Sequence, residues 1–126
     1  MKLAHLIAST LLLAAASFAQ ALEVKPYSAA ALAEAQKADK PVVLHFRADW
    51  CPTCRAQDKV LASLKTEPGL DLTVLAVNYD TEKDLNKRFG IRAQSTFVVL
   101  HGQKERGRSV GDITADGLRT ALKAAL

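Results

Sequence analysis

The sequence predicts an α/β fold, with a mixed central β-sheet and helices on both of its faces. Three apolar runs rich in β-branched residues, "PVVLHFR", "LDLTVLAVN" and "STFVVLH", have the composition of strands covered on both faces. Segments with helical spacing of their apolar residues alternate with these runs. The length of 126 residues suits one domain with a real core and is too short for two.

The first 21 residues have the pattern of a secretory signal peptide. Lys2 precedes an apolar run, and the segment ends in the small residues Ala19 and Ala21. We expect cleavage after Ala21, with a cut after Ala19 as the alternative, and a periplasmic or otherwise exported domain over residues 22–126. An uncleaved anchor is disfavoured because residues 11–19 are short against the ~20 that span a bilayer, so no stable membrane insertion is expected after cleavage.

The first half of the exported part predicts a helix, a strand and a second helix. Ser28 is a good N-cap for a helix over residues 29–38. Pro41 begins the strand "PVVLHFR". The segment "RAQDKVLASLK" then places Ala56, Val60, Leu61 and Leu64 on one helical face, and the Pro-Gly pair at 68–69 ends it.

The second half predicts three more strands, the last two of them in a hairpin, and two helices. Strand "LDLTVLAVN" is followed by a short helix capped by Thr81 and Asp84 and closed by Gly90. Strand "STFVVLH" turns into a shorter strand over residues 106–110, and Thr114 caps the last helix. The strand–helix–strand unit over 41–78 should be a right-handed parallel crossover, and the final strand pair an antiparallel hairpin.

Charge argues against nucleic acid as a partner. The formal net charge is +4, and the basic residues are scattered. The densest basic cluster, Lys104, Arg106 and Arg108, is interrupted by Glu105 and Gly107. No basic stripe with interleaved aromatic residues is present, so we expect no nucleic-acid binding.

The chain's only two cysteines, Cys51 and Cys54, leave three interpretations: a metal site, a structural staple or a redox pair. A loop this short gives a disulfide little to stabilise. Zinc usually takes four ligands, and residues 22–126 add only His45 and His101, neither at ligand spacing. We therefore expect no metal and no cofactor, with a cluster shared between two chains left as an alternative.

A redox pair suits the place of the cysteines in the chain. Cys51 lies where a buried strand passes into a helix, and a helix N-terminus favours a thiolate. Pro52 suits the first helical turn, and Arg47 and Arg55 could add positive potential. Cys54 follows one turn later, within reach of Cys51 but tucked further in, an asymmetry that thiol–disulfide exchange needs.

The segment "VVLHFRADWCPTCRAQ" resembles the active-site segment of the thioredoxin superfamily, and "FGIRAQSTFVVLHGQKE" resembles the second half of that fold. The resemblance covers residues 22–126 and implies a thioredoxin-like fold. It also implies a dithiol–disulfide oxidoreductase with Cys51 as nucleophile and Cys54 as resolving cysteine of a redox-active disulfide. The "CPTCRA" form is similar to exported thioredoxin-like proteins that serve cytochrome c maturation as reductants, but the extra insertion of that group is missing here.

The resemblance leads us to expect an exported enzyme of cell redox homeostasis that exchanges disulfides with client proteins. The "CPTCRA" form favours a reductant, whereas the nearby arginines and the loss of a buried acid favour an oxidant; we expect the reductant. Expected partners are clients with thiols or disulfides and an upstream redox partner, and the protein is expected to be a monomer. The alternative is a binding module of the same fold that is redox-silent or holds a metal or cluster.

Five residues are predicted to bind the substrate: Trp50, Pro52, Thr53, Gln94 and Ser95. Ser95 stands where the family usually has a proline preceded by a cis bond. A cis bond before a non-proline residue costs about 3–4 kcal/mol, so we predict a trans Gln94–Ser95 bond and a shifted loop. The Ser95 hydroxyl could bond a thiolate, leave room for a metal, or belong to an ordinary loop serine.

His45 takes the place of a buried acid that assists proton transfer with the resolving cysteine in the family. Burial favours the neutral form of histidine, and a neutral imidazole can accept a proton from Cys54. His45 is therefore predicted to be catalytic, with a hydrogen-bonded core histidine as the alternative. Asp49 is interpreted as a helix cap.

Overall fold

The computed structural model describes residues 21–126, so the predicted signal peptide lies, except for Ala21, outside the described residues. The elements are, in chain order, β1 (Glu23–Pro26), α1 (Ala29–Lys37), β2 (Pro41–Arg47), α2 (Pro52–Leu64), β3 (Thr73–Asn78), α3 (Lys83–Phe89), β4 (Thr96–His101), β5 (Lys104–Val110) and α4 (Ala115–Lys123). In this part of the chain, no helix combines the length and hydropathy needed to cross a bilayer.

The five strands form one mixed sheet in the order β1-β3-β2-β4-β5. Strands β1, β3 and β2 run parallel, whereas β4 is antiparallel to both β2 and β5. The parallel β2–β3 pair and the antiparallel β4–β5 hairpin were both predicted from the sequence. The predicted α/β architecture is therefore confirmed.

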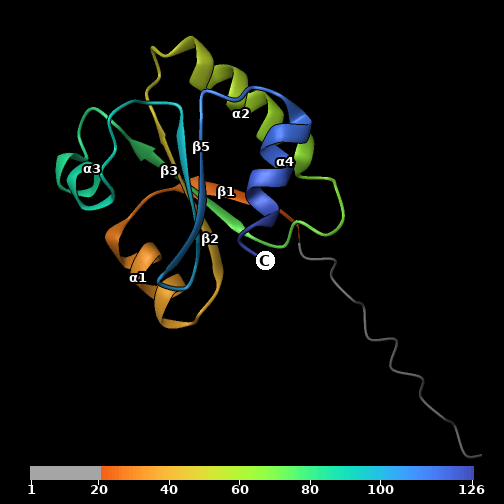
Figure 1. The fold of residues 1–126 in the computed structure, drawn as a ribbon, viewed down its shortest axis with the longest axis horizontal. Coiled ribbons are helices and arrows are strands. Elements are labelled where there is room, and N and C mark those ends of the chain that lie inside the picture. The colour runs from red at the N-terminus through yellow and green to blue at the C-terminus, as the bar shows by residue number, and fades with distance from the viewer. Residues whose placement is uncertain (1–20) are drawn as a thin grey trace, which may run out of the picture.

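Helices cover both faces of the sheet, with α1 and α3 on one side and α2 and α4 on the other (Figure 1). Each side has its own buried core because side chains of a strand alternate between the two faces. The core under α1 and α3 is built from Leu32, Val42, Leu44, Phe46, Leu75, Val77, Leu85, Val98 and Leu100. The core under α2 and α4 includes Val43, Leu61, Leu64, Val74, Phe97, Val99, Leu118 and Leu122.

The helix ends follow the sequence signals in most places. The side chains of Ser28 and Thr114 accept backbone N–H groups at the starts of α1 and α4. Gly90 ends α3 in the left-handed conformation at φ 63°. The predicted cap of α3 is wrong: Glu82 is the N-cap and makes no side-chain hydrogen bond to the helix.

Strand β1 was not predicted from the sequence, and β5 begins two residues earlier than predicted. Strand β1 is four residues long, lies at the edge of the sheet, and is exposed at three of its four positions. Strand β5 is the opposite edge, and most of its side chains are exposed. Edge strands bury little apolar surface, so their sequences carry a weak hydrophobic pattern.

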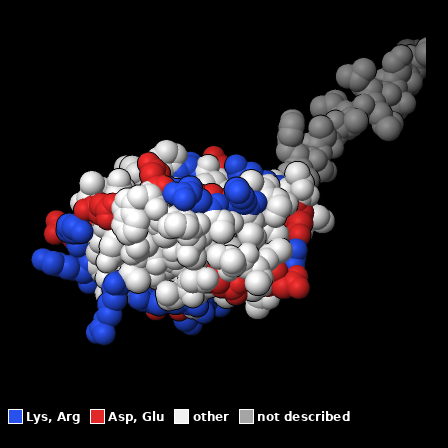
Figure 2. All heavy atoms as spheres, turned by 90° about the horizontal axis from the view of Figure 1, so that it is seen from above, with Lys and Arg blue, Asp and Glu red and all other residues white. Residues whose placement is uncertain are grey.

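Charged side chains are mixed on the face at the top of Figure 1, where α2 begins. Figure 2 shows that face with Lys and Arg interspersed with Asp and Glu around a broad area of other residues. This face therefore has no continuous area of one charge sign.

Candidate active site at the start of helix α2

The two cysteines form a disulfide at the N-terminus of α2. Cys51 is the N-cap residue, and its Sγ accepts the backbone N–H of Cys54 at 3.2 Å. Pro52 is the first residue of the helix. A sulfur in this position faces unpaired N–H groups and the positive end of the helix, both of which stabilise a thiolate.

Both sulfurs are buried in the disulfide form. The exposed fraction is 3% for Cys51 and 0% for Cys54. Cys54 is thus slightly more buried than Cys51, in the order expected from the sequence. Ala48 packs with the two cysteines in a small apolar cluster and contributes to this burial.

Ser95 lies against both sulfurs. Its Oγ is 3.2 Å from Cys51 Sγ and 3.1 Å from Cys54 Sγ. Residues 21–126 contain no cis peptide bond, so the predicted trans Gln94–Ser95 bond is confirmed. Ser95 has φ 64°, whereas proline is fixed near about −65°. This loop conformation therefore excludes the proline that the family usually has here.

His45 is buried in β2 and contacts Gln57 rather than a sulfur. Its ring stacks on Phe97 with centroids 4.0 Å apart, and its Nε2 lies 2.8 Å from Gln57 Oε1. Burial lowers the pKa of His45 from 6.5 to about 4, partly opposed by the Gln57 hydrogen bond and the charge of Asp58. Within residues 21–126 no hydrogen bond joins His45 to either cysteine, so its catalytic role stays a prediction.

Gln57 is a site residue that the sequence analysis did not single out. It is fully buried in α2, and its Nε2 donates to two backbone carbonyls, Ser95 O at 3.2 Å and Asp112 O at 3.0 Å. Carbonyl oxygens can only accept, so the amide nitrogen must face them and Oε1 must face His45. His45 Nε2 is therefore the donor of that hydrogen bond.

A polar residue on the buried face of α2 was the signal that could have revealed Gln57. Cys54, Gln57, Leu61 and Leu64 are the buried residues of the helix and are spaced by three or four positions. A glutamine in such an apolar stripe needs hydrogen-bond partners inside the fold.

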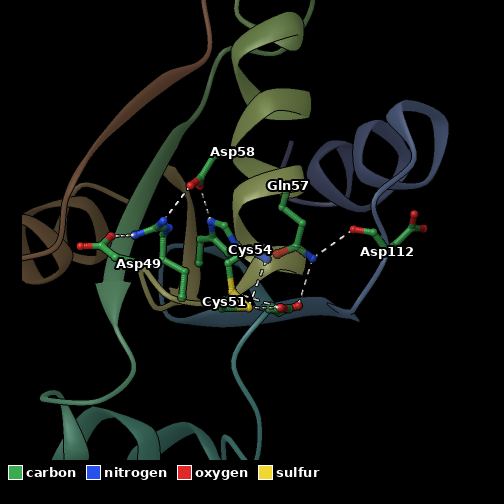
Figure 3. A network of polar contacts seen from close by, with 9 residues as sticks. Asp49, Cys51, Cys54, Gln57, Asp58 and Asp112 are labelled. Atoms are coloured by element: carbon green, nitrogen blue, oxygen red, sulfur yellow. Dashed lines mark hydrogen bonds and ion pairs between the residues drawn. A yellow bond between two sulfur atoms is a disulfide. The ribbon is translucent and has the colours of Figure 1, made fainter.

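The polar contacts near the disulfide extend to Asp58 and Asp49, as Figure 3 shows. His45 Nδ1 lies 3.8 Å from Asp58 Oδ1, and Arg47 pairs with Asp58 and with exposed Asp49, each at 2.8 Å. The charge of Arg47 is thus compensated by two carboxylates, contrary to its expected contribution of positive potential. Asp49 does not cap α2: its carboxylate binds Arg47, and its carbonyl accepts from Arg55.

Of the remaining predicted substrate-binding residues, Trp50, Pro52 and Thr53 flank the cysteines in the chain, and Gln94 directly precedes Ser95. Trp50 is 58% exposed, and its indole N–H donates to Asp80 Oδ2 at 2.8 Å. Pro52 is exposed, whereas Thr53 and Gln94 are partly buried. Their role in binding a substrate stays a prediction.

Two exposed apolar side chains, those of Val110 and Ile113, lie on either side of Gly111 and Asp112. The backbone N–H of Gly111 donates to the carbonyl of Ser95. Val110 is the β5 residue that pairs with Thr96. Ile113 follows Asp112, whose carbonyl accepts a hydrogen bond from Gln57. Their exposed fractions are 65% and 52%. Exposed apolar side chains near a reactive group are suited to contact another protein.

No ligand set for a metal is found in the described part of the chain. Among residues 21–126, no group of three or more His, Cys, Asp or Glu side chains lies close enough to hold an ion. A metal site within one chain therefore has no support from side-chain geometry there.

Comparisons with known proteins place the chain in a family. Residues 23–124 match the family model described as Thioredoxin. The thiol:disulfide interchange protein TxlA of Synechococcus elongatus is 33% identical over 89 residues, covering 68% of this chain and 47% of that protein, so the chain spans about half the length of this relative. Thioredoxin of Rickettsia bellii is 27% identical over 78 residues, covering 62% of this chain and 74% of that protein.

A solved structure also resembles this chain in both fold and sequence. The crystal structure of Trxlp from Edwardsiella tarda has a TM-score of 0.74 at 38% identity, over 79% of this chain and 98% of that one. Its similarity and the family match agree with the fold and with the Cys51–Cys54 disulfide described above. The chain belongs to the thioredoxin family, and its Cys51–Cys54 pair is a thioredoxin-type thiol–disulfide oxidoreductase centre.

Proposed function

We propose that this protein is an exported reductase of client disulfides. The observation that carries the proposal is the Cys51–Cys54 disulfide at the start of α2, with Cys51 Sγ accepting a helix N–H and the Ser95 hydroxyl against both sulfurs. These groups are placed to stabilise the thiolate that thiol–disulfide exchange requires.

The reaction has two exchange steps. In the reduced protein, Cys51 thiolate attacks one sulfur of a client disulfide, forms a mixed disulfide and releases the other client sulfur as a thiolate, which takes up a proton. Cys54 then loses its proton and attacks Cys51 Sγ, which restores the Cys51–Cys54 disulfide and releases the second client thiol. Two electrons have passed to the client, so an upstream dithiol partner must return two electrons and two protons to the protein.

The proposed direction rests on the site and on the "CPTCRA" sequence form. Arg47 was one reason to expect an oxidant, but Asp49 and Asp58 compensate its charge. The reduction potential of the pair decides the direction, and equilibration with glutathione buffers measures it. A value near that of thioredoxin, about −270 mV, supports a reductase, whereas one near that of DsbA, about −120 mV, would contradict it.

Client proteins are proposed to dock over Trp50, Val110 and Ile113, together with Pro52 and Thr53 next to the disulfide. Trp50, Val110 and Ile113 are the exposed large apolar residues of the site region. Removing Trp50 by Trp50→Ala should raise KM for a protein disulfide with little change in the rate toward a small disulfide such as oxidised glutathione.

Insulin reduction tests the enzymatic proposal directly. The wild-type protein, supplied with dithiothreitol, should accelerate insulin precipitation, and Cys51→Ser should abolish the acceleration. Cys54→Ser should instead accumulate a mixed disulfide with insulin, detectable by mass under non-reducing conditions. Wild type without activity in either redox form would point to a binding module.

His45 is proposed to influence the resolving step, in which Cys54 must lose its proton. Its buried imidazole is neutral above a pKa of about 4 and carries its proton on Nε2, so Nδ1, which faces Asp58, is the nitrogen that can accept a proton at neutral pH. The test is the rate of mixed-disulfide resolution in wild type and His45→Ala over a pH series. An unchanged rate and pH profile would remove His45 from the mechanism.

Export is proposed from the apolar segment that ends at Ala21. The periplasmic protein recovered from a bacterial host should begin at Leu22 by mass. Retention of the full-length chain in the cytoplasm would contradict both the export and the cleavage site.

A further inference from the structure

We propose that Gln57 is a positioning residue for thiol–disulfide exchange: it holds the Ser95 loop so that the Ser95 hydroxyl lies between the two sulfurs. The proposal rests on the proposed function and names a residue that assists that reaction. Ser95 would then be the group that touches the reacting atoms, and Gln57 would act through it.

Gln57 joins three segments that are far apart in the chain. From α2, its amide donates to the carbonyl of Ser95, just before β4, and to the carbonyl of Asp112, just after β5. The Ser95 carbonyl also accepts the backbone N–H of Gly111 at 3.0 Å. The loop that carries Ser95 is therefore tied to α2, which begins directly after Cys51 and contains Cys54.

The backbone of Ser95 needs such support. Its φ of 64° lies in the left-handed region, which is unfavourable for a residue with a Cβ atom. A conformation of this kind persists where surrounding contacts fix it. The hydrogen bonds to its carbonyl, from Gln57 and Gly111, are contacts of that kind.

The position of the Ser95 hydroxyl suits both steps of exchange. Its Oγ is almost equally distant from the two sulfurs, at 3.2 Å and 3.1 Å. A hydroxyl has one proton to donate, so in the reduced protein it can bond whichever sulfur is the thiolate. It would bond Cys51 at rest and Cys54 during resolution, and it keeps its own proton throughout.

His45 completes the arrangement from the other side of Gln57. With both amide hydrogens used on carbonyls, Gln57 Oε1 is satisfied by the N–H of His45 Nε2 at 2.8 Å. The histidine is itself fixed by stacking on Phe97. The amide of Gln57 therefore cannot rotate without leaving a buried group unpaired.

A double-mutant cycle tests the proposal. The readouts are the pKa of the Cys51 thiol, from alkylation of the reduced protein by iodoacetamide as a function of pH, and the reduction potential in glutathione buffers. Ser95→Ala should raise the thiol pKa by about one unit, because a hydrogen bond to a charged group is lost. A tenfold loss of thiolate corresponds to a potential lower by about 30 mV.

Gln57→Met should shift both quantities in the same direction by half or more of that amount. In the Ser95→Ala background, Gln57→Met should add less than about a quarter of its single effect, because its action runs through the hydroxyl that is already gone. If Gln57→Met does not fold, Gln57→Asn keeps a buried amide that is one methylene too short for the same carbonyls.

Two matched controls separate positioning from stability. Thr96→Val removes the neighbouring buried hydroxyl, which donates to the Ala93 carbonyl and touches no sulfur. Asn86→Leu removes a buried amide of α3 that donates to the Tyr79 carbonyl. Both controls should destabilise the fold and leave the thiol pKa unchanged.

An unchanged thiol pKa in Ser95→Ala would overturn the proposal, and so would equal effects of Gln57→Met with and without Ser95. These measurements use only iodoacetamide and glutathione, so they succeed or fail independently of any client activity. The insulin assay can therefore fail while this proposal stands, and this proposal can fail while the insulin assay succeeds.

Discussion

The two faces of strand β2 differ in chemistry although they belong to one strand. Val42, Leu44 and Phe46 face α1 and α3 in an apolar core. On the other face, Val43 belongs to an apolar core, but His45 stacks on Phe97 and bonds Gln57 in front of the disulfide. One face therefore serves packing, and the other adds a buried polar network beside the redox pair at the start of α2.

This difference indicates how the structure separates stability from reactivity. Apolar contacts contribute in proportion to the area they bury and are insensitive to pH. Buried polar groups contribute little net stability when paired and cost free energy when a partner is removed. We expect changes on the α1 side to alter stability alone, and changes on the α2 side to alter stability, pH dependence and redox properties together.

The largest effect is expected on the apolar face, from Leu44→Ala. Leu44 is fully buried, and truncation of a buried leucine to alanine costs about 2–5 kcal/mol. Urea unfolding of the oxidised protein measures the loss. The reduction potential should stay at the wild-type value, and a shift of 30 mV or more would show that the two faces are not independent.

The pH dependence of stability is the second prediction, and it belongs to the polar face. The pKa of His45 is lowered by burial from 6.5 to about 4 in the folded protein. Between these pH values the unfolded chain binds more protons, so the contribution of His45 is complete above about pH 6.5 and is lost as the pH falls toward 4. The loss amounts to about 3 kcal/mol.

The matched variant for that prediction is His45→Phe, which keeps a ring against Phe97 and cannot titrate. It should be less stable than wild type at neutral pH because Gln57 Oε1 loses its partner. Between pH 6.5 and 4 its urea midpoint should fall less steeply than that of wild type. Parallel curves would mean that His45 is not buried in the neutral form.

Two helix caps, one on each side of the sheet, give the third prediction. Ser28→Ala and Thr114→Ala should each cost about 1 kcal/mol, because each removes an oxygen that accepts a backbone N–H. Thr114 also holds the Asp112 carboxylate, and the Asp112 carbonyl binds Gln57. Of the two cap variants, only Thr114→Ala should therefore shift the pKa of the Cys51 thiol, and its shift should be smaller than that of Ser95→Ala. A thiol pKa shift of the same size in Ser28→Ala would contradict this prediction.

The smallest effect is expected from Asp49→Asn at the outer end of the polar network. The Asp49 side chain is 99% exposed, and exposed ion pairs contribute little because water and salt screen them. Urea midpoint, thiol pKa and reduction potential should all match wild type. A clear shift in the thiol pKa would show that the charges on Arg47 and its partners reach the sulfurs after all.

The main elements and the redox pair could be predicted from the sequence because their signals are local. The three central strands are nearly continuous apolar runs, and Ser28, Gly90 and Thr114 mark helix ends by their own side chains or backbone freedom. Strand β1 could not be recognised, because a short exposed edge strand has no such pattern. It is defined by its pairing with β3.

The sequence by itself determined the mixed sheet, the place of Cys51 and Cys54 at the start of α2, and the trans bond before Ser95. These follow from hydrophobic periodicity, helix capping and the cost of a cis bond without proline. Only the tertiary structure decided that Gln57 joins His45 to the Ser95 and Asp112 carbonyls. The reason is physical: which buried donor meets which acceptor depends on how α2 packs against β2, β4 and the loop after β5.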